Sequence, residues 1–489
     1  MTSKSNHGSL FDRIFLRFSP LHTNGHLRWT RILVLYCISH GFLVFSWNAL
    51  YWDDWMVYAT GSEGVKSYFA ECTRCSLPGR ATIEATLIAP GPWLMRVLTF
   101  LYFPLIAILL AAFLRRTRWL RNRETSYITL LVLFMPAYGA RISHIDYQYS
   151  FSLLLFVLGA WMTLSPHMLI RICALFPIFW SMFVASLQVF VVVLIAVLGV
   201  RLVRRELQRS ADRLVTLGAL CVFPIVHRYL LPVLFPSYVV TDGYNTIQVA
   251  FLLRAVVFTS LLLIPLMILG LKLQREKAMS REFVLLSIGF AVLGAGTFPY
   301  LAVGHFANLS DWILPFLPDE SDWNSRHQLL QPFGIALILL AAAKMLRKRK
   351  QAFLFAIISI SVVLNIATYS GYYLDWMKQR EFITEMSESR ELLLDTKSMV
   401  LVDEALRFNA RGRGVRPYEW TAMVNRATDL NITVDGNSLQ FCREYSPSHL
   451  VTVSASQGRL RSLISGRIGV SVNLKKIETC SSLPLASND

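Results

Sequence analysis

Two adjacent aspartates, Asp53 and Asp54, lie within the aromatic stretch Tyr51-Trp52-Asp53-Asp54-Trp55, directly after an apolar run. Because neighbouring carboxylates repel each other, one of the two is expected to hold a proton more readily than an isolated aspartate. Such a carboxylate suits a general base, which must accept a proton during catalysis. The alternative is that the aromatic residues form an interfacial belt and that both aspartates face water. The stretch by itself supports both interpretations equally.

Three arginines, Arg96, Arg228 and Arg254, lie inside apolar runs that contain no acidic residue. An unpaired charge in hydrocarbon costs at least about 2.5 kcal/mol, so each arginine needs an explanation. For Arg96 and Arg254, which lie near the ends of their runs, snorkelling to the headgroups is an equally good explanation. Arg228 is deeper and follows His227. Together the three arginines predict a site for an anion, and a lipid phosphate is the natural candidate because guanidinium matches phosphate geometry.

A further basic pair, Arg326 and His327, ends an acidic loop just before the chain re-enters an apolar run. Arg326 is the only Lys or Arg in that loop. It is expected to contact phosphate or pyrophosphate, and the alternative is a local salt bridge with Asp322.

Composition shows which elements must position these residues. The 489-residue chain is 54% hydrophobic and 16% charged, and its apolar runs of about 18 to 22 residues predict a polytopic helical membrane protein. The net charge of +17 does not indicate nucleic-acid binding, because outside the C-terminal region most Lys and Arg residues flank apolar runs on one side, as the positive-inside rule requires. We expect about eleven transmembrane helices, over residues 32–50, 93–114, 126–140, 150–164, two within 172–200 with a turn near 186–188, and 214–235, 249–271, 283–303, 329–343 and 352–369.

This pattern divides the chain into two parts. Residues 1–370 form the transmembrane module, with a cytoplasmic N-terminus and a long outer loop over residues 51–92. Residues 371–489 form an extracytoplasmic α+β domain, whose alternating stretches 399–402 and 450–453 predict strands. The outward cysteines are expected to pair as Cys72–Cys75 and Cys442–Cys480, whereas those inside apolar runs (Cys37, Cys173 and Cys221) are expected to be buried thiols.

This layout resembles the GT-C superfamily of membrane glycosyltransferases, which use polyprenyl-phosphate-linked sugars. Asp53-Asp54 match the family's catalytic carboxylate in the first outer loop, and Asp146, two residues after His144, occupies the position of its second acidic motif. The segments 228–232 and 326–332 are similar to an Arg-Tyr-x-x-Pro pattern that binds lipid phosphate in relatives. The oligosaccharyltransferase signature Trp-Trp-Asp does not occur in the C-terminal region, which has only Tyr418-Glu419-Trp420. The resemblance is therefore to bacterial enzymes that decorate O-antigen, lipid A or other envelope glycans.

The resemblance implies transfer of a sugar, with inversion, from a polyprenyl-phosphate donor to a glycan or glycolipid acceptor at the outer face of the inner (plasma) membrane. One of Asp53 and Asp54 would act as general base. Arg228, Arg254, Arg326 and His327 would bind the donor phosphate.

The same resemblance assigns auxiliary roles. Trp52 and Trp55 would stack on sugar faces, and His144 and Asp146 would orient the acceptor or hold an optional divalent metal ion. Two rival functions stay open, a lipid-linked oligosaccharide polymerase or ligase, and a non-enzymatic glycolipid transporter. A transporter is expected to show midplane charges and paired repeats, which this sequence lacks.

Overall fold

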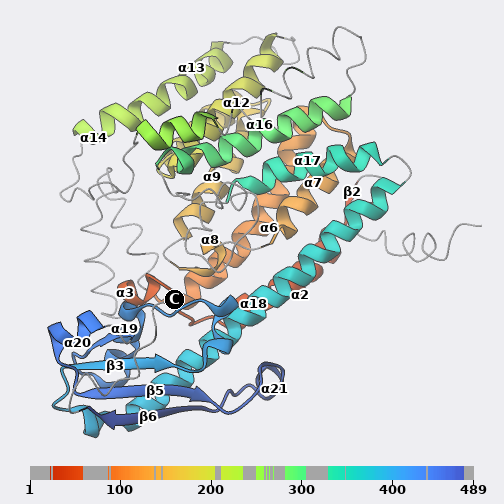
Figure 1. Ribbon diagram of the computed structural model, residues 1–489. Helices are drawn as coiled ribbons and strands as arrows, with labels where there is room; N and C mark the ends of the chain where they lie inside the picture. Colours follow the sequence, from red (N-terminus) through yellow and green to blue (C-terminus); the bar gives the residue numbers. More distant parts are fainter. Residues whose placement is uncertain are drawn as a thin grey trace, which may run out of the picture.

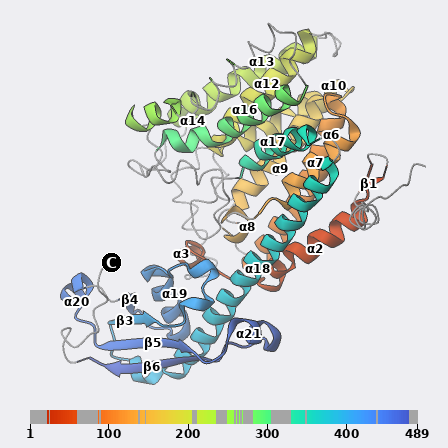
Figure 2. The ribbon, with the colours of Figure 1, turned by 45° about the vertical axis from the view of Figure 1, so that its right-hand side comes forward.

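The protein consists of a helical part and a smaller C-terminal part that contains a sheet (Figure 1). The computed structural model describes residues 22–23, 26–58, 90–136, 139–144, 147–203, 211–234, 249–257, 281–303, 329–346, 349–436 and 439–477, and the single positions 86, 260, 264 and 268. Figure 2 shows the same two parts, with the long helix α18 (Lys350–Glu388) running from one into the other.

Three helices within the described ranges are long and apolar enough to cross a bilayer: α6 (Pro92–Thr117), α16 (Arg281–Ala302) and α18. Shorter apolar helices accompany them. Large side chains such as Val34, Ile38 and Val203 are more than half exposed on the outside of the helices, as lipid-facing residues are. These features indicate a membrane protein, whereas the expected number of eleven spans stays a prediction.

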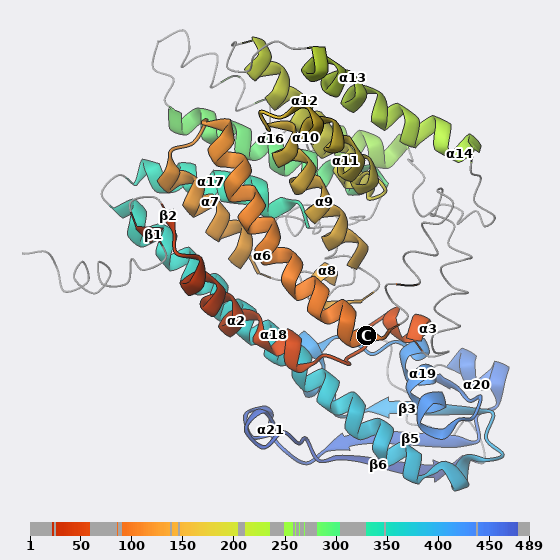
Figure 3. The ribbon, with the colours of Figure 1, turned by 180° about the vertical axis from the view of Figure 1, so that it is seen from behind.

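The helical part is held together by an extended apolar core. Helix α2 (Trp29–Phe45) runs along α18 (Figure 3), α6 packs against α7 (Asn122–Phe134) and α9 (Tyr147–Thr163), and α16 packs against α17 (Gln331–Met345). The last pair approaches closely because Gly334 has no side chain: a Cβ there would lie 2.5 Å from the backbone nitrogen of Leu293. The other described helices are α3 (Asp54–Tyr58), α8 (Gly139–Ile142), α10 (Met168–Cys173), α11 (Leu175–Ser181), α12 (Ala185–Val203), α13 (Ala211–Ile225) and α14 (Leu231–Leu234), with a short hairpin of β1 (His22–Thr23) and β2 (His26–Leu27) at the start.

The long apolar block at residues 172–200 is interrupted slightly before the position at which the sequence predicts a turn, whereas its division into two membrane spans stays a prediction. Helix α11 ends at Ser181 and α12 begins at Ala185. The side-chain amide of Gln188 donates to the carbonyl of Met182 (3.0 Å), so the turn lies just before the position near residues 186–188 that charge placement indicated.

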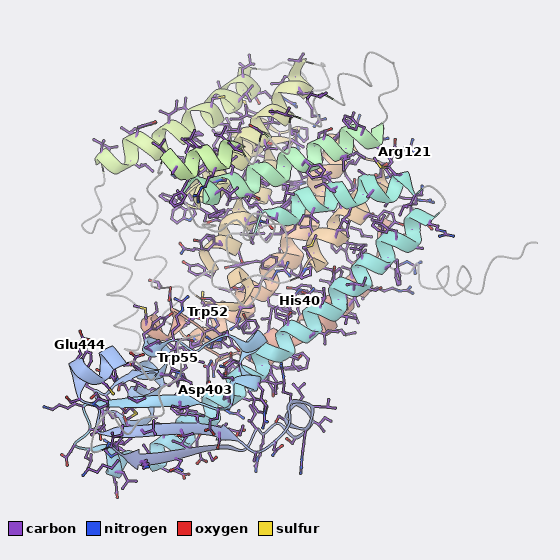
Figure 4. All side chains as sticks on the ribbon, viewed as in Figure 1. His40, Trp52, Trp55, Arg121, Asp403 and Glu444 are labelled. Atoms are coloured by element: carbon purple, nitrogen blue, oxygen red, sulfur yellow. The ribbon has the colours of Figure 1, made fainter. Side chains whose placement is uncertain are left out.

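Charged residues meet at the end of the helical part where the sequence predicts the cytoplasmic face. Glu124 at the start of α7 pairs with Arg281 of α16 (3.0 Å) and with Lys344 of α17 (3.1 Å), and Lys344 also contacts Glu282 (3.2 Å). These ion pairs tie three helix ends together. They lie at the opposite end of the bundle from the C-terminal part (Figure 4, where Arg121 of the same end is labelled).

The C-terminal part contains a four-stranded mixed sheet in the order β4-β3-β5-β6. Strand β3 (Ser398–Asp403) is parallel to both β4 (Thr433–Asp435) and β5 (His449–Ala455), and β6 (Val470–Lys476) is antiparallel to β5. Helices α19 (Pro417–Thr428), α20 (Leu439–Tyr445) and α21 (Arg459–Ser465) alternate with the strands. The short turns η6 (Arg390–Leu393), η7 (Leu406–Phe408) and η8 (Ala410–Gly412) complete it. The two stretches predicted as strands are therefore strands β3 and β5.

The expected division at residue 370 falls inside α18, which continues without interruption to Glu388. Side chains beyond the apolar half of α18, including Leu374, Met377 and Phe382, belong to the core of the C-terminal part. Helix α18 thus contributes side chains to the cores of both parts. The two parts are therefore joined by a continuous helix and not by a linker.

The cysteine predictions have mixed outcomes. Cys442 is disulfide-bonded, whereas its expected partner Cys480, and the pair Cys72 and Cys75, lie outside the described residues. The three cysteines of the apolar runs are free, as expected, but they are exposed on helix surfaces and not buried. The sequence identifies an apolar helix without showing which of its faces packs against a neighbour.

Candidate functional site

The stretch Tyr51 to Trp55 lies at the junction between the helical part and the C-terminal part, and Figure 4 shows Trp52 and Trp55 there. Trp52 has a φ of +52°, which a residue with a side chain rarely adopts. Its backbone N–H donates to the buried carboxylate of Glu419 in α19 (3.0 Å). Such strained conformations persist where surrounding contacts impose them, often at functional sites. Here the turn sends the two following aspartates to different partners.

Asp54 is completely buried and is held by the helical part. Its Oδ1 accepts hydrogen bonds from the Ser143 hydroxyl and from the backbone N–H of His144, both at 2.8 Å. Its Oδ2 accepts from the backbone N–H of Tyr51 (3.2 Å). Both oxygens of Asp54 accept hydrogen bonds and the side chain is buried, so Asp54 joins the start of the first outer loop to the segment at residues 141–144.

Asp53 is only partly buried, and it faces the C-terminal part. The phenol of Tyr418, in α19, donates to its Oδ1 (2.8 Å). Burial raises the pKa of Tyr418, and the negative charge of Asp53 raises it further, so the phenol stays a donor at neutral pH. Asp53 therefore keeps an accessible carboxylate, oriented by one fixed hydrogen bond, whereas Asp54 does not.

Arg96 and His144 are buried next to the loop that holds Asp54. The guanidinium of Arg96 donates to the carbonyls of Ile142 (2.6 Å) and Arg141 (3.3 Å), so Arg96 is 2% exposed and does not snorkel to headgroups. His144 donates from Nε2 to the carbonyl of Ala49 (2.6 Å). Burial lowers the pKa of His144 well below its ordinary value, and the charge of Arg96, 3.3 Å away, lowers it further. His144 is thus a neutral structural group in this network.

Arg141 connects the same buried network to helices α2 and α6. Its guanidinium lies 2.8 Å from Nε2 of His40, which α2 supplies, and 3.9 Å from the centroid of the Phe103 ring. His40 is fully buried and its other ring nitrogen lies 2.6 Å from the Ser39 hydroxyl. The loop that carries Ser143 and His144 is therefore anchored on both sides, which fixes the donors that hold Asp54.

A second buried network joins the C-terminal part to the stretch from the other side. Arg413 donates to Asp375 of α18 (2.7 Å) and to both oxygens of Glu419 (2.9 and 3.0 Å). Burial alone would lower the pKa of Arg413, but the two carboxylates raise it well above its ordinary value, so it is a permanent cation. Its guanidinium also lies over the rings of Tyr51 and Trp52, at 5.6 and 5.5 Å from their centroids.

The two tryptophans have places that do not suit the sugar-stacking role expected for them. Trp52 and Trp55 are each 2% exposed. Trp52 packs against Tyr372, with ring centroids 5.9 Å apart, and Trp55 belongs to the core of the C-terminal part. In this structure neither ring offers a free face, because the C-terminal part covers the loop that the sequence alone leaves open to solvent.

The expected phosphate-binding residues are only partly described. Arg254 is exposed on a helical segment over residues 249–257, with its guanidinium 5.8 Å from the Phe251 ring centroid. Arg228 lies in a π-helical turn, Val226–Leu230, and its side chain is outside the described part of the structure. Asp146, Arg326 and His327 also lie outside the described residues. The convergence of these groups with Asp53 stays a prediction.

A metal site was expected only as an option. Within the described part of the chain, no group of three or more His, Cys, Asp and Glu side chains is placed to hold a metal ion. Of the two expected ligands, His144 donates to a carbonyl (2.6 Å), and Asp146 lies outside the described residues.

Sequence reasoning missed the residues that complete the site from a distance. Arg413, Glu419 and Asp375 lie more than 300 positions from Asp53 in the chain, and nothing local marks them as its neighbours. One sequence signal points to this helix: Tyr418-Glu419-Trp420 is a partial match to the Trp-Trp-Asp signature. In the structure Tyr418 and Glu419 are the residues of α19 that contact Asp53 and Trp52.

The sequence matches no protein-family model and no curated protein.

Proposed function

We propose that this protein is a membrane glycosyltransferase that moves a sugar from a polyprenyl-phosphate donor to an envelope glycan or lipid acceptor. The observation that carries the proposal is the separation of roles between the two adjacent aspartates. Asp54 is completely buried and accepts three hydrogen bonds, while Asp53 is only partly buried and is aligned by Tyr418. A rigidly placed, solvent-reachable carboxylate next to an apolar helical part suits proton abstraction from an acceptor hydroxyl.

The proposed reaction follows from this placement. Asp53 takes the proton of the acceptor hydroxyl, and the acceptor oxygen attacks the anomeric carbon of the donor sugar from the face opposite the phosphate. The bond between that carbon and the phosphate oxygen breaks, its electron pair leaves with the polyprenyl phosphate, and the anomeric configuration inverts. Arg228, Arg254, Arg326 and His327 are the proposed contacts for the leaving phosphate.

Asp54, Ser143 and His144 act in this proposal as positioning residues. Their hydrogen bonds fix the backbone on which Asp53 is carried, and misplacement of a catalytic group by about 1 Å can reduce a rate by about 10²-fold. The proposed setting is the inner (plasma) membrane of a bacterium, with the C-terminal part outside the cytoplasm, and an O-antigen or lipid A glycan as the kind of acceptor.

The purified protein, reconstituted in proteoliposomes, tests the proposal against its rivals. A panel of polyprenyl-phosphate monosaccharides labelled in the sugar is supplied with an envelope glycolipid extract as acceptor. A glycosyltransferase releases one polyprenyl phosphate for each labelled sugar that becomes bound to acceptor. A transporter moves the intact lipid-linked sugar across the bilayer without release, and a polymerase yields chains of repeated units. Either of the latter results contradicts the proposal.

A further inference from the structure

Helix α21 (Arg459–Ser465) lies at the tip of the connection between β5 and β6, and this connection has a firmly held base. The pairing of the two strands continues past their ends, from Ser456 N to Gly469 O (3.1 Å) and from Gln457 N to Ile468 O (3.2 Å). Glu381 of α18 accepts hydrogen bonds from three consecutive backbone N–H groups, at residues 468–470 (2.7, 2.8 and 3.0 Å). The position of α21 is therefore set by the fold.

This fixed element presents apolar side chains outward. Leu460 is 72% exposed and Ile464 is 80% exposed, and on a helix residues four apart lie on one face. The neighbouring Leu463 packs inward against the core of the C-terminal part. A rigid pair of outward aliphatic side chains is unfavourable in water, and contact with an apolar surface would remove it from water.

The charged side chains that this connection itself carries are all basic. Arg459, Arg461 and Arg467 are all exposed, and residues 456–469 contain no acidic residue. Arginine beside exposed Leu and Ile is typical of helices that lie in the interface of a membrane with anionic lipids. A phosphate-bearing surface therefore complements this segment in both charge and polarity.

The position of α21 agrees with such a surface. Figures 1 and 3 show α21 projecting from the sheet alongside α18, apart from α19 and α20. A guanidinium nitrogen of Arg459 lies 3.5 Å from where a Cβ of Gly371 would be, and Gly371 follows directly on the apolar half of α18. The Arg459 side chain of α21 thus reaches the part of α18 at which that helix is expected to leave the bilayer.

We propose that α21 binds the membrane surface on the side of the C-terminal part, with Leu460 and Ile464 inserted between headgroups and the three arginines on anionic lipid phosphates. This contact, with the rigid α18, holds the C-terminal part at a fixed height above the bilayer. The proposal requires only that the protein spans a membrane, so it is independent of the proposed glycosyl transfer.

A nitroxide probe tests the contact in the full chain. The three free cysteines of the helices are replaced by alanine, Ile464→Cys is spin-labelled, and the protein is reconstituted in vesicles of phosphatidylglycerol and phosphatidylethanolamine. The unmodified cysteine background, treated with the same label, gives the signal to subtract. The matched control is Leu392→Cys, because Leu392 is similarly exposed (71%) but lies in η6, beyond the end of α18. Power saturation then compares collisions with oxygen, which is enriched in lipid, and with a water-soluble nickel chelate.

At position 464 we expect oxygen to relax the probe more strongly than the chelate, and at position 392 the reverse. Replacing the three arginines by glutamine, or using phosphatidylcholine vesicles, should shift position 464 toward the water-exposed behaviour by severalfold in the accessibility ratio. A label at 464 that is as accessible to nickel as that at 392 overturns the proposal. Protection from both reagents also overturns it, because that result indicates a second copy of the chain on this face.

Discussion

The buried cation Arg413 provides the strongest test of how the two parts of the protein are joined. Replacing it with glutamine leaves the carboxylates of Asp375 and Glu419, both 0% exposed, without their shared positive charge. Each carboxylate keeps backbone donors, from Ala410 (3.0 Å) for Asp375 and from Trp52 (3.0 Å) for Glu419. Those donors satisfy hydrogen bonding but do not neutralise two buried negative charges.

Removing one partner of a buried ion pair typically costs about 3–5 kcal/mol, so Arg413→Gln should lower the free energy of unfolding by about that amount. Loss of the contacts with the rings of Tyr51 and Trp52 adds about 0.5–2 kcal/mol. The double variant Arg413→Gln/Glu419→Gln removes one of the stranded charges as well. It should recover part of the loss, which a double-mutant cycle measures directly.

Thermal unfolding in detergent, followed by tryptophan fluorescence, together with limited proteolysis provides the assay. Cleavage should begin at the junction, because the contact between α19 and the first loop weakens first. The exposed Arg390→Gln is the matched control and should change stability by no more than about 0.5 kcal/mol. If Arg413→Gln is as stable as the control, the network does not hold the two parts together.

Three further predictions concern the helical part. The pKa of His144 is lowered in the folded state. His144 therefore contributes stability above about pH 6.5, and this contribution is lost as the pH falls, at up to about 1.4 kcal/mol per pH unit. His144→Gln should flatten this dependence of stability on pH in melting curves recorded at several pH values. Gly334→Ala should destabilise by about 1–3 kcal/mol because its Cβ meets the backbone of α16, whereas Gly199→Ala, which has open space, should be neutral or stabilising. Reporter fusions after Arg205 and after Tyr373 should report cytoplasmic and external locations respectively, and reversal of either signal rules out the predicted topology.

The sequence contains much of the fold because periodicity and composition are local properties. Apolar runs identify helices such as α6 and α18, and alternation identifies strands β3 and β5. Burial of a particular face depends on which helices become neighbours. The sequence therefore does not show that Arg96 is inside, that Cys37 is outside, or that Trp52 and Trp55 are covered.

The candidate site also has features that the sequence shows and features that depend on the tertiary structure. Adjacent carboxylates after an apolar run are visible in the sequence, and they mark Asp53 and Asp54 as one unit. Their different roles depend on Ser143, Tyr418 and Glu419, which reach them only through the tertiary structure. The unusual backbone angle of Trp52 that separates the two aspartates has no sequence signal, since glycine or asparagine is the residue normally expected there.

The most direct test of the central claim compares sugar transfer by Asp53→Asn and Asp54→Asn in the same proteoliposomes. Asparagine keeps the shape of Asp53 but accepts no proton, so transfer should fall by about 10²-fold or more while donor binding and thermal stability persist. Asp54→Asn places an amide against fixed donors and should cost about 1–3 kcal/mol of stability. An Asp53→Asn protein that transfers sugar at a near-normal rate contradicts the assignment of Asp53 as the general base.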